Sequence, residues 1–255
     1  MMPWVHSYRR YHFGKGDPIN VPMFPGTGAE IWFVQSGKLL IDGILRHDGL
    51  LCLRHECLIF RQKDLVIFSI RLRAGALPFF APREMTDIID GFHPLSCIWG
   101  EPGARLSRHI QSCKNFREQC HVAGEFLRDI CKAGRRFETM QRVSENIYED
   151  SAYFSIEAFS AHIRKHRSVI SHGFHETQGV SIKYFHRLCR FERFIRDALY
   201  TSDTSLCNLS LQHGYYDQAH MNRDVKLMTG TSPVYLRQLC TSRLFYAARR
   251  TRTSV

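Results

Sequence analysis

The pattern of apolar residues divides the chain into three parts. Short apolar runs of four to six residues, separated by glycine, aspartate or charged residues, occupy much of the first hundred positions. Regularly spaced short strands are typical of β-sandwiches and barrels, so this part predicts a β-rich barrel. The predicted strands are Glu30–Val34, Lys38–Ile41, Leu50–Leu53, Cys57–Phe60 and Leu65–Ile70. Ser36-Gly37 and Asp42-Gly43 are candidate hairpin turns, and we predict no specific strand before Glu30.

The period changes to that of amphipathic helices between about residues 104 and 149. Leu106 and Ile110 share one helical face, and Met140, Val143 and Ile147 share another. These helices could bridge two domains, pair with a second subunit or pack on the barrel. The spacing does not choose among the three.

Residues 151–240 are helical throughout, with residues typical of helix ends at regular intervals. Serine, threonine and aspartate favour the N-cap position, glycine favours the position after a helix, and proline favours the first helical position. The predicted boundaries are Ser155, Gly179, Ser181, Thr204 or Ser205, Gly214, Asp217, Gly230 and Ser232-Pro233. We expect the basic tail from Arg243 to Val255 to fray.

This third part contains two similar units, residues 156–179 and 206–230. Each reads as a short helix, a tight turn and a longer helix, the pattern of a helix-turn-helix. One stripe of the longer helix would form a small core and leave the opposite stripe free to enter a DNA major groove. The predicted core stripes are Ile170 and Phe174 in the first unit, and Met221, Val225 and Met228 in the second.

A helix over residues 181–200 connects the two units, with apolar residues on more than one face. Twenty residues at ~1.5 Å each span ~30 Å. One turn of B-DNA measures about 34 Å. We therefore hypothesise that this helix holds two recognition helices in successive major grooves.

Charge supports a polyanionic partner for the C-terminal part. The 255 residues carry a formal net charge of +11, with ordinary hydrophobic (44%) and charged (23%) fractions. Residues 151–255 hold 15 Lys/Arg and 7 Asp/Glu, so most of the excess lies there. Solubility alone is the alternative explanation.

Other chemistry has little support in the sequence. No apolar run approaches the ~20 residues that span a bilayer, and the N-terminus lacks a signal-peptide pattern, so we expect a cytoplasmic protein without membrane contact. The nine cysteines include no CxxC pair, which indicates reduced thiols. Cys52, His55 and Cys57 could bind a metal by residue type, but buried thiols beside a surface histidine fit better. We therefore expect no metal, no cofactor and no catalytic residues.

The second unit resembles the signature of the AraC/XylS transcriptional regulators. The matching positions are Leu209-Ser210, Gly214-Tyr215, Asp217-Gln218, His220-Met221, Asn222-Arg223, Val225-Lys226, Gly230, Ser232-Pro233 and Arg237. The resemblance covers residues 151–240 and implies two helix-turn-helix units joined by a long helix. The first hundred residues, notably Phe68–Gly75 and Leu95–Gly100, resemble more weakly the barrel-type sensor or dimerisation domains of that family.

The chain departs from the family pattern at several positions. His172 stands where the first recognition helix usually has arginine, and Gly173 follows it inside the helix, at a cost of about 1 kcal/mol relative to alanine. Met221 and Val225 stand where aromatic residues are usual. These changes bear on how strongly the first unit reads bases.

The expected fold is α+β. A cupin-like β-rich sensor or dimerisation domain spans residues 1–103, a helical linker spans 104–150, and an all-α tandem helix-turn-helix domain spans 151–255. The expected function is a sequence-specific DNA-binding transcription regulator of bacterial type, and not an enzyme. A non-specific architectural DNA-binding protein is the alternative. A DNA-repair alkyltransferase is a weaker one, because the chain has no Pro-Cys-His-Arg-like nucleophile.

The partners that we expect are double-stranded DNA, with RNA polymerase, a small-molecule effector of unknown identity and a second copy of the chain as further candidates. Gln218 can pair with adenine, Arg223 with guanine or phosphate, and Lys226 with phosphate. An ion pair of Arg223 with Asp224 or Asp217 is the alternative for that residue. The DNA-binding candidates are Arg167, Ser168, Ser171, His172, Gln218, Ala219, His220, Asn222, Arg223 and Lys226. Four arginines predict a solvated or ion-paired face of the connecting helix, with contact to the DNA backbone as the alternative: Arg187, Arg190, Arg193 and Arg196.

Overall fold

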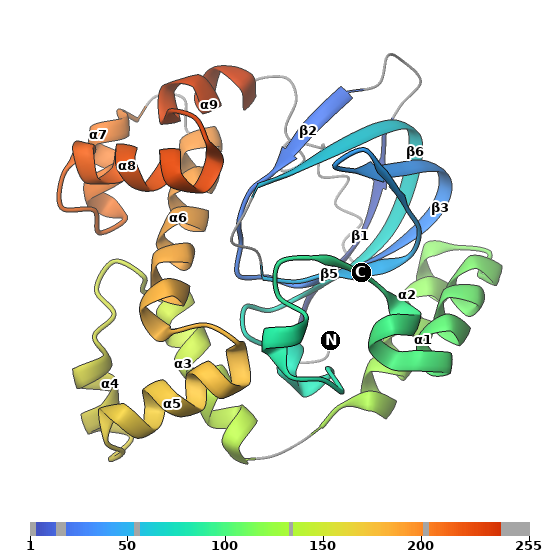
Figure 1. The fold of residues 1–255 in the computed structure, drawn as a ribbon, viewed down its shortest axis with the longest axis horizontal. Helices are drawn as coiled ribbons and strands as arrows, with labels where there is room; N and C mark the ends of the chain where they lie inside the picture. Colours follow the sequence, from blue (N-terminus) through green and yellow to red (C-terminus); the bar gives the residue numbers. More distant parts are fainter. Residues whose placement is uncertain (1–3, 14–18, 54–56, 133–134, 201–203, 241–255) are drawn as a thin grey trace.

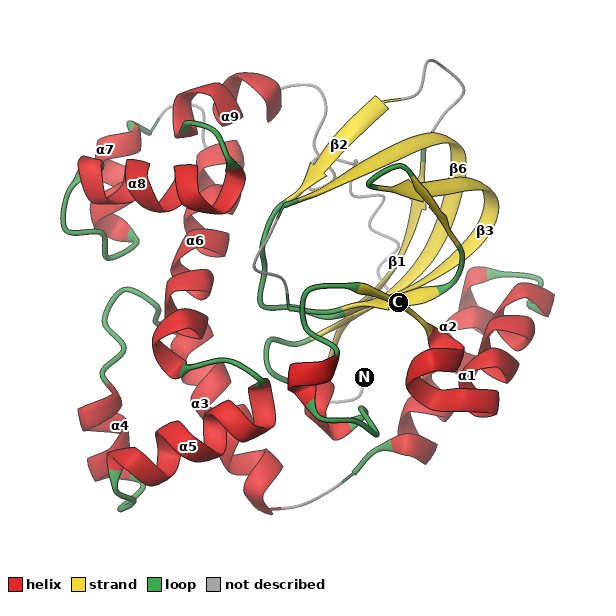
Figure 2. Ribbon diagram, viewed as in Figure 1, coloured by secondary structure: helices red, strands yellow, loops and turns green. Residues whose placement is uncertain are grey.

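The strands gather in one part of the molecule with two helices beside them, and the remaining helices gather in another part (Figures 1 and 2). The computed structural model describes residues 4–13, 19–53, 57–132, 135–200 and 204–240. The strands are β1 (Val5–His12), β2 (Ile19–Met23), β3 (Glu30–Ile41), β4 (Ile44–Arg46), β5 (Gly49–Leu51), β6 (Leu58–Leu72) and β7 (Phe92–Pro94). Two short 3-10 helices, η1 (Leu77–Phe79) and η2 (Met85–Asp87), lie between β6 and β7.

The helices follow the strands along the chain. They are α1 (Leu95–Ser112), α2 (Phe116–Ile130), α3 (Arg135–Glu149), α4 (Ile156–His162), α5 (Arg167–Gln178), α6 (Ile182–Tyr200), α7 (Leu206–Gln212), α8 (Gln218–Thr229) and α9 (Pro233–Cys240). The α+β prediction, with a β-rich N-terminal part and a helical C-terminal part, is confirmed. No described helix is both long and apolar enough to cross a membrane.

The sheet is antiparallel, in the order β1-β6-β3-β5-β7, with β2 also pairing β6 and β4 also pairing β3. Its two longest strands, β3 and β6, pair along most of their length. The strand β1 was not predicted, because its sequence is rich in polar and basic residues and only Val5 and Tyr11 of it are buried.

The hairpin predicted at Ser36-Gly37 is wrong, because this pair lies inside β3. The register between β3 and β6 shifts on both sides of Ser36, and Gly37 adopts a φ of +83°. A Cβ at Gly37 would lie 2.3 Å from the carbonyl oxygen of Asp64, which itself has a φ of +50°. The two strands therefore bulge together, and the segments predicted as separate strands around Asp64 form the single strand β6.

The other predicted turn is confirmed. Asp42 and Gly43 have φ values of +50° and +79° and connect β3 to β4, as a two-residue hairpin loop requires. A further difference is that α1 begins at Leu95, inside the segment predicted as strand and turn, and kinks at Gly100, whose φ is +61°.

The three helices after the sheet divide between two cores. Leu106, Ile110 and Leu127 of α1 and α2 pack with the sheet, while Met140 and Val143 of α3 pack with the C-terminal helices. In Figure 1 α1 and α2 lie beside the strands, and α3 lies with α5 and α6. Of the arrangements that the spacing left open, α1 and α2 adopt packing on their own sheet.

The predicted helix boundaries of the C-terminal part are confirmed. The side chains of Ser155, Ser205 and Asp217 accept hydrogen bonds from the backbone N–H three residues later, at 3.2, 3.1 and 2.6 Å. Gly179 and Gly230 end α5 and α8 in the left-handed conformation, each with a φ of +73°. The tail from Arg243 to Val255, predicted to fray, lies outside the described residues.

Gly173 lies where α5 approaches α3. A Cβ at this position would meet the thioether of Met140 at 3.5 Å, an ordinary van der Waals distance. The glycine is therefore not required by the packing, and it keeps the entropic penalty of glycine inside a helix.

Gly173→Ala should raise the free energy of unfolding by about 0.5–1 kcal/mol, because alanine restricts the unfolded chain and adds contact with Met140. Urea denaturation followed by circular dichroism measures this. Gly179→Ala is the matched control: at a φ of +73°, its Cβ would lie 3.1 Å from the backbone of Met85. It should lose stability by more than about 1 kcal/mol. Destabilisation by Gly173→Ala would show that the backbone approach there is tighter than described.

Candidate nucleic-acid interface

Two bihelical units stand at the two ends of α6. The short helices α4 and α7 have seven residues each, and the longer helices α5 and α8 have twelve each. Figure 1 shows α4 and α5 beside the first turns of α6, and α7 and α8 beside its last turns. The helices of this part therefore follow the predicted order of a short helix and a longer helix on each side of the connecting helix.

The inner stripes of both longer helices are buried as predicted. Ile170 and Phe174 of α5, and Met221 and Val225 of α8, have no exposed surface, and Met228 is 4% exposed. These side chains belong to one continuous cluster that also contains the apolar residues of α6. Burial of the inner stripes fixes which stripe of each helix faces outward.

The connecting helix α6 is covered by apolar contacts on several faces. Phe185, Leu188, Phe191 and Phe194 have no exposed surface. Its 19 residues give a length of roughly 28 Å at about 1.5 Å per residue. A helix buried on several faces is held straight by its neighbours, so the two units are attached to one rod.

Three arginines of α6 bind neighbouring elements. The predicted ion pairing applies to one of them, and the other two donate to backbone carbonyls. Arg187 Nε donates to Asp224 Oδ1 of α8 at 2.5 Å. Arg190 donates to the carbonyl of Gly214 at 3.1 Å and lies over the ring of Tyr215, 4.8 Å from its centroid. These contacts join α6 to the second unit.

The third arginine joins α6 to α3. Arg193 Nη1 donates to the carbonyl of Tyr148 at 2.7 Å, and also to that of Glu149, at the C-terminal end of α3. A cation there interacts favourably with the helix dipole. Much of the positive charge of α6 is therefore used inside the protein.

The first set of candidate residues lies on α5, and all four are exposed. Arg167 Nη1 donates to Glu157 Oε1 of α4 at 3.0 Å, and His172 Nε2 lies 3.5 Å from Glu176 Oε2. Ser168 Oγ lies 2.7 Å from Nδ1 of His166, the N-cap residue of α5. Ser171 is the member of this set whose side chain has no such contact among the described residues.

The second set lies on α8, and five of its six members are exposed. His220 is half-buried, with its ring edge-on to Tyr215 at 5.3 Å and its Nδ1 accepting from the backbone N–H of Tyr216 at 3.4 Å. No described residue forms a hydrogen bond or ion pair with the side chain of Gln218, Asn222, Arg223 or Lys226.

The predicted alternative partners of Arg223 have other contacts. Asp217 Oδ1 accepts the backbone N–H of His220, and Asp224 is 5% exposed and paired with Arg187. Neither carboxylate forms an ion pair with Arg223. The guanidinium of Arg223 is therefore presented to solvent on the outward stripe of α8.

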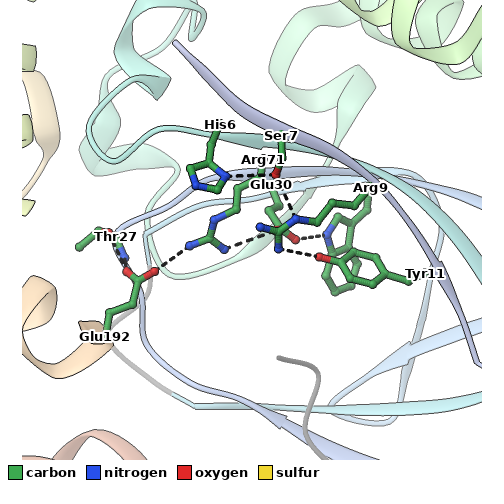
Figure 3. Close-up of polar contacts among 9 residues, drawn as sticks. His6, Ser7, Arg9, Tyr11, Thr27, Glu30, Arg71 and Glu192 are labelled. Carbon is green, nitrogen blue, oxygen red and sulfur yellow. Dashed lines mark hydrogen bonds and ion pairs between the residues drawn. The ribbon is translucent and has the colours of Figure 1, made fainter. Parts of the chain in front are cut away.

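A buried ion pair joins the sheet to α6 (Figure 3). Arg71 Nη2 of β6 donates to Glu192 Oε1 at 2.7 Å, and Arg71 Nη1 lies 3.3 Å from Glu30 Oε1 of β3. The other Glu192 oxygen accepts from the backbone N–H and the hydroxyl of Thr27, at 3.0 and 2.7 Å. Sequence reasoning missed this junction, although a lone acid between Phe191 and Arg193 was a signal for it.

The junction keeps Glu192 charged despite its burial. Burial by itself would raise the pKa of this carboxyl, but Arg71 and the two hydrogen bonds from Thr27 outweigh it and hold the pKa below its ordinary value. Beside it, burial together with Arg71 and Arg9 lowers the pKa of His6 to about 4. His6 is therefore neutral at physiological pH, and Arg71 carries the positive charge that faces Glu192.

Two of the three candidate metal ligands, Cys52 and Cys57, lie within the described residues. Cys52 is buried and donates to the carbonyl of Ile88, Cys57 is half-buried, and His55 lies outside the described residues. The described residues contain no group of three or more His, Cys, Asp or Glu side chains placed to hold a metal ion. The eight cysteines whose side chains the structure describes are free thiols.

Comparisons with known proteins support the fold. No protein-family profile and no curated protein matches the sequence. Among solved structures, ToxT from Vibrio cholerae O395 is 12% identical, with a TM-score of 0.50 over 92% of this chain and 98% of that chain. At this identity the likeness concerns the fold alone: a β-rich N-terminal part followed by a helical C-terminal part.

Two further structures are similar at lower scores. Unsaturated-fatty-acid-bound ToxT from V. cholerae strain SCE256 is 13% identical over 95% of this chain and 99% of that chain, with a TM-score of 0.49. The C-terminal domain of AraT, a response regulator from Geobacillus stearothermophilus, is 16% identical over 47% of this chain and 98% of that chain, with a TM-score of 0.39.

Glu192→Gln should lower the free energy of unfolding by about 1–3 kcal/mol, because it replaces a charged acceptor of three hydrogen bonds. It should also speed amide exchange at Thr27 and along α6. The effect should be largest at neutral pH: the pKa of Glu192 is lower in the folded chain, so its contribution is complete above the unfolded value and is lost as pH falls through the folded value.

Denaturation at pH 7 and pH 4, with hydrogen exchange, measures both effects. Glu101→Gln is the control, since Glu101 forms an exposed pair with Arg108 and its loss should leave stability nearly unchanged. Equal effects of the two substitutions would mean that the Glu192 contact does not hold the sheet to α6.

Proposed function

We propose that this protein is a sequence-specific DNA-binding transcription regulator that reads two successive major-groove segments with α5 and α8. The observation that carries the proposal is the pair of bihelical units fixed at the two ends of one buried helix, each with an exposed outer stripe. The length of α6, roughly 28 Å, is close to the pitch of B-DNA, about 34 Å.

The residues that we propose as DNA contacts are the ten candidates from the sequence. Gln218 and Asn222 carry the amides that pair with adenine, and Arg223 carries the guanidinium that pairs with guanine. Ala219 and Ser171 are small enough to allow close approach to base edges, and Lys226 is suited to phosphate. Their exposure supports these roles, except that His220 is half-buried and serves the turn before α8 as well.

We further propose that the N-terminal domain is a cupin-like sensor or dimerisation domain. The packing of α1 and α2 on the sheet and of α3 on the C-terminal helices supports a boundary between α2 and α3, later than the predicted residue 103. The Arg71–Glu192 junction offers a direct route by which an effector or a second copy bound to the sheet would act on α6. RNA polymerase remains a candidate partner, and a cytoplasmic location follows from this function.

A non-specific architectural DNA-binding protein is the second candidate. The positive surplus of residues 151–255 favours it equally, because phosphate contacts require only charge. It predicts strong salt dependence without sequence preference. Catalysis, including alkyl transfer, has no support in the residues, and we propose that the protein is not an enzyme.

Selection of bound duplexes from random DNA tests the proposal. The purified full-length protein should enrich a motif with two parts whose centres lie about 10 base pairs apart, the spacing of successive major grooves. Enrichment of no motif, with salt-sensitive binding to every duplex, would favour the architectural alternative.

Arg223→Ala tests the main predicted contact on a selected duplex. It should weaken binding by ~1–3 kcal/mol and relax the base preference at one position if Arg223 reads a base. It should instead reduce the salt slope by about one if Arg223 binds a phosphate. Fluorescence anisotropy at several salt concentrations separates the two. Unchanged affinity and slope would exclude Arg223 from the interface.

A further inference from the structure

The two candidate reading helices differ in what surrounds their charged side chains. On α5 the cationic candidate Arg167 is paired with Glu157 at 3.0 Å, and both side chains are about two-thirds exposed, at 64% and 66%. His172 lies 3.5 Å from Glu176, one turn further along the same exposed stripe. On α5, Arg167 and His172 therefore each lie beside a carboxylate.

Glu157 is held in position by more than one contact. Its Oε2 accepts from the hydroxyl of Ser155, the N-cap of α4, at 3.1 Å, while its Oε1 accepts from Arg167. Its own backbone N–H, then Arg167 and Ser155, lower the pKa of the Glu157 carboxyl, so the group is an anion at neutral pH. This anion both neutralises Arg167 and would repel a DNA phosphate brought close to it.

The two acids of the second unit, Asp217 and Asp224, both have contacts within the protein. Asp217 caps the helix, and Asp224 is buried against Arg187 of α6. Arg223 and Lys226 are exposed, and no described side chain pairs with either of them. The helix α8 therefore presents two uncompensated cations, whereas the two basic candidates on α5 each lie beside a carboxylate. Arg164 and Lys165 are also exposed, but they lie in the turn before α5.

We infer that the two units contribute unequally to DNA binding. The helix α8 provides most of the affinity, and Glu157 weakens the binding of α5 to DNA. This inference rests on the proposed function and deepens it. Affinity and counterion release come mainly from the α8 half of the site, because each phosphate neutralised by a free cation contributes about 0.9 to the salt slope. Arg167 contributes only to the extent that it leaves Glu157.

The remaining chemistry of α5 suits one kind of sequence. Val169, 58% exposed, lies on the same helix as the hydroxyl of Ser171. An apolar side chain contacts the thymine methyl group, and a serine hydroxyl accepts or donates to several bases. The α5 half of the site is then a thymine-containing segment read weakly, beside a segment read more strongly through the amides and Arg223 of α8.

The test is a substitution that strengthens binding. Glu157→Gln removes the anion, retains the size of the side chain and releases Arg167. On a selected duplex near 100 mM salt it should tighten binding by about 2- to 5-fold, the range that an exposed pair allows, and steepen the salt slope by about one. Arg167→Ala alone should weaken binding less than Arg223→Ala does.

Two further variants assign the effect. In the double variant Glu157→Gln with Arg167→Ala, the gain should disappear, because the released cation is absent. Glu101→Gln removes the same charge from a similarly exposed pair with Arg108, 2.6 Å apart, on α1, and should leave DNA affinity unchanged. Circular dichroism confirms that each variant is folded before binding is compared.

The outcomes separate this inference from the proposed function. A gain in DNA affinity that is specific to Glu157→Gln and depends on Arg167 supports the unequal contributions of the two units. No gain, a gain that survives without Arg167, or an equal gain from Glu101→Gln overturns it even when the wild-type protein reads its selected site. Failure of the wild-type protein to select any sequence overturns the proposed function itself.

Discussion

The burial of α6 on several faces is the constraint on which the rest of the structure depends. Phe185, Phe191 and Phe194 have no exposed surface, because α3, the two bihelical units and α9 enclose the helix. A helix enclosed in this way has one available position. Because both units pack on α6, their positions are fixed with it. Their separation is therefore set by the length of α6 and does not depend on a flexible linker.

Charge in the C-terminal part serves two purposes that composition cannot separate. Arg187, Arg190 and Arg193 use their donors on a carboxylate and on backbone carbonyls of neighbouring elements. Arg223 and Lys226 remain at the surface. The net charge is therefore larger than the positive charge that is available to bind DNA. The helix whose basic side chains are not paired with acids attracts a polyanion most strongly. The same principle appears at the sheet, where Arg71 holds Glu192 and fixes α6 to the N-terminal part.

Local signals in the sequence were sufficient for the helical part and insufficient for the sheet. Caps such as Ser155 and Asp217, and terminal glycines such as Gly179, act within a few residues, so the boundaries and inner stripes of the helices followed from the sequence. Strand pairing depends on distant partners: Gly37 resembles a turn residue but bulges because Asp64 lies opposite it. The Glu192 junction and the pairing of Arg167 with Glu157 were missed for the same reason, since each partner is set by tertiary structure.

The most direct test of the account varies the spacing between the two parts of a selected DNA site. If α6 is a rigid rod, affinity should be greatest when the two centres lie about 10 base pairs apart and should fall towards that of one half-site when about 5 base pairs are inserted, because the second major groove then faces away. We do not expect the affinity to recover when the two centres lie about 20 base pairs apart, since α6 cannot lengthen. Affinity that is independent of spacing would contradict the claim that one buried helix fixes the separation of the two reading helices.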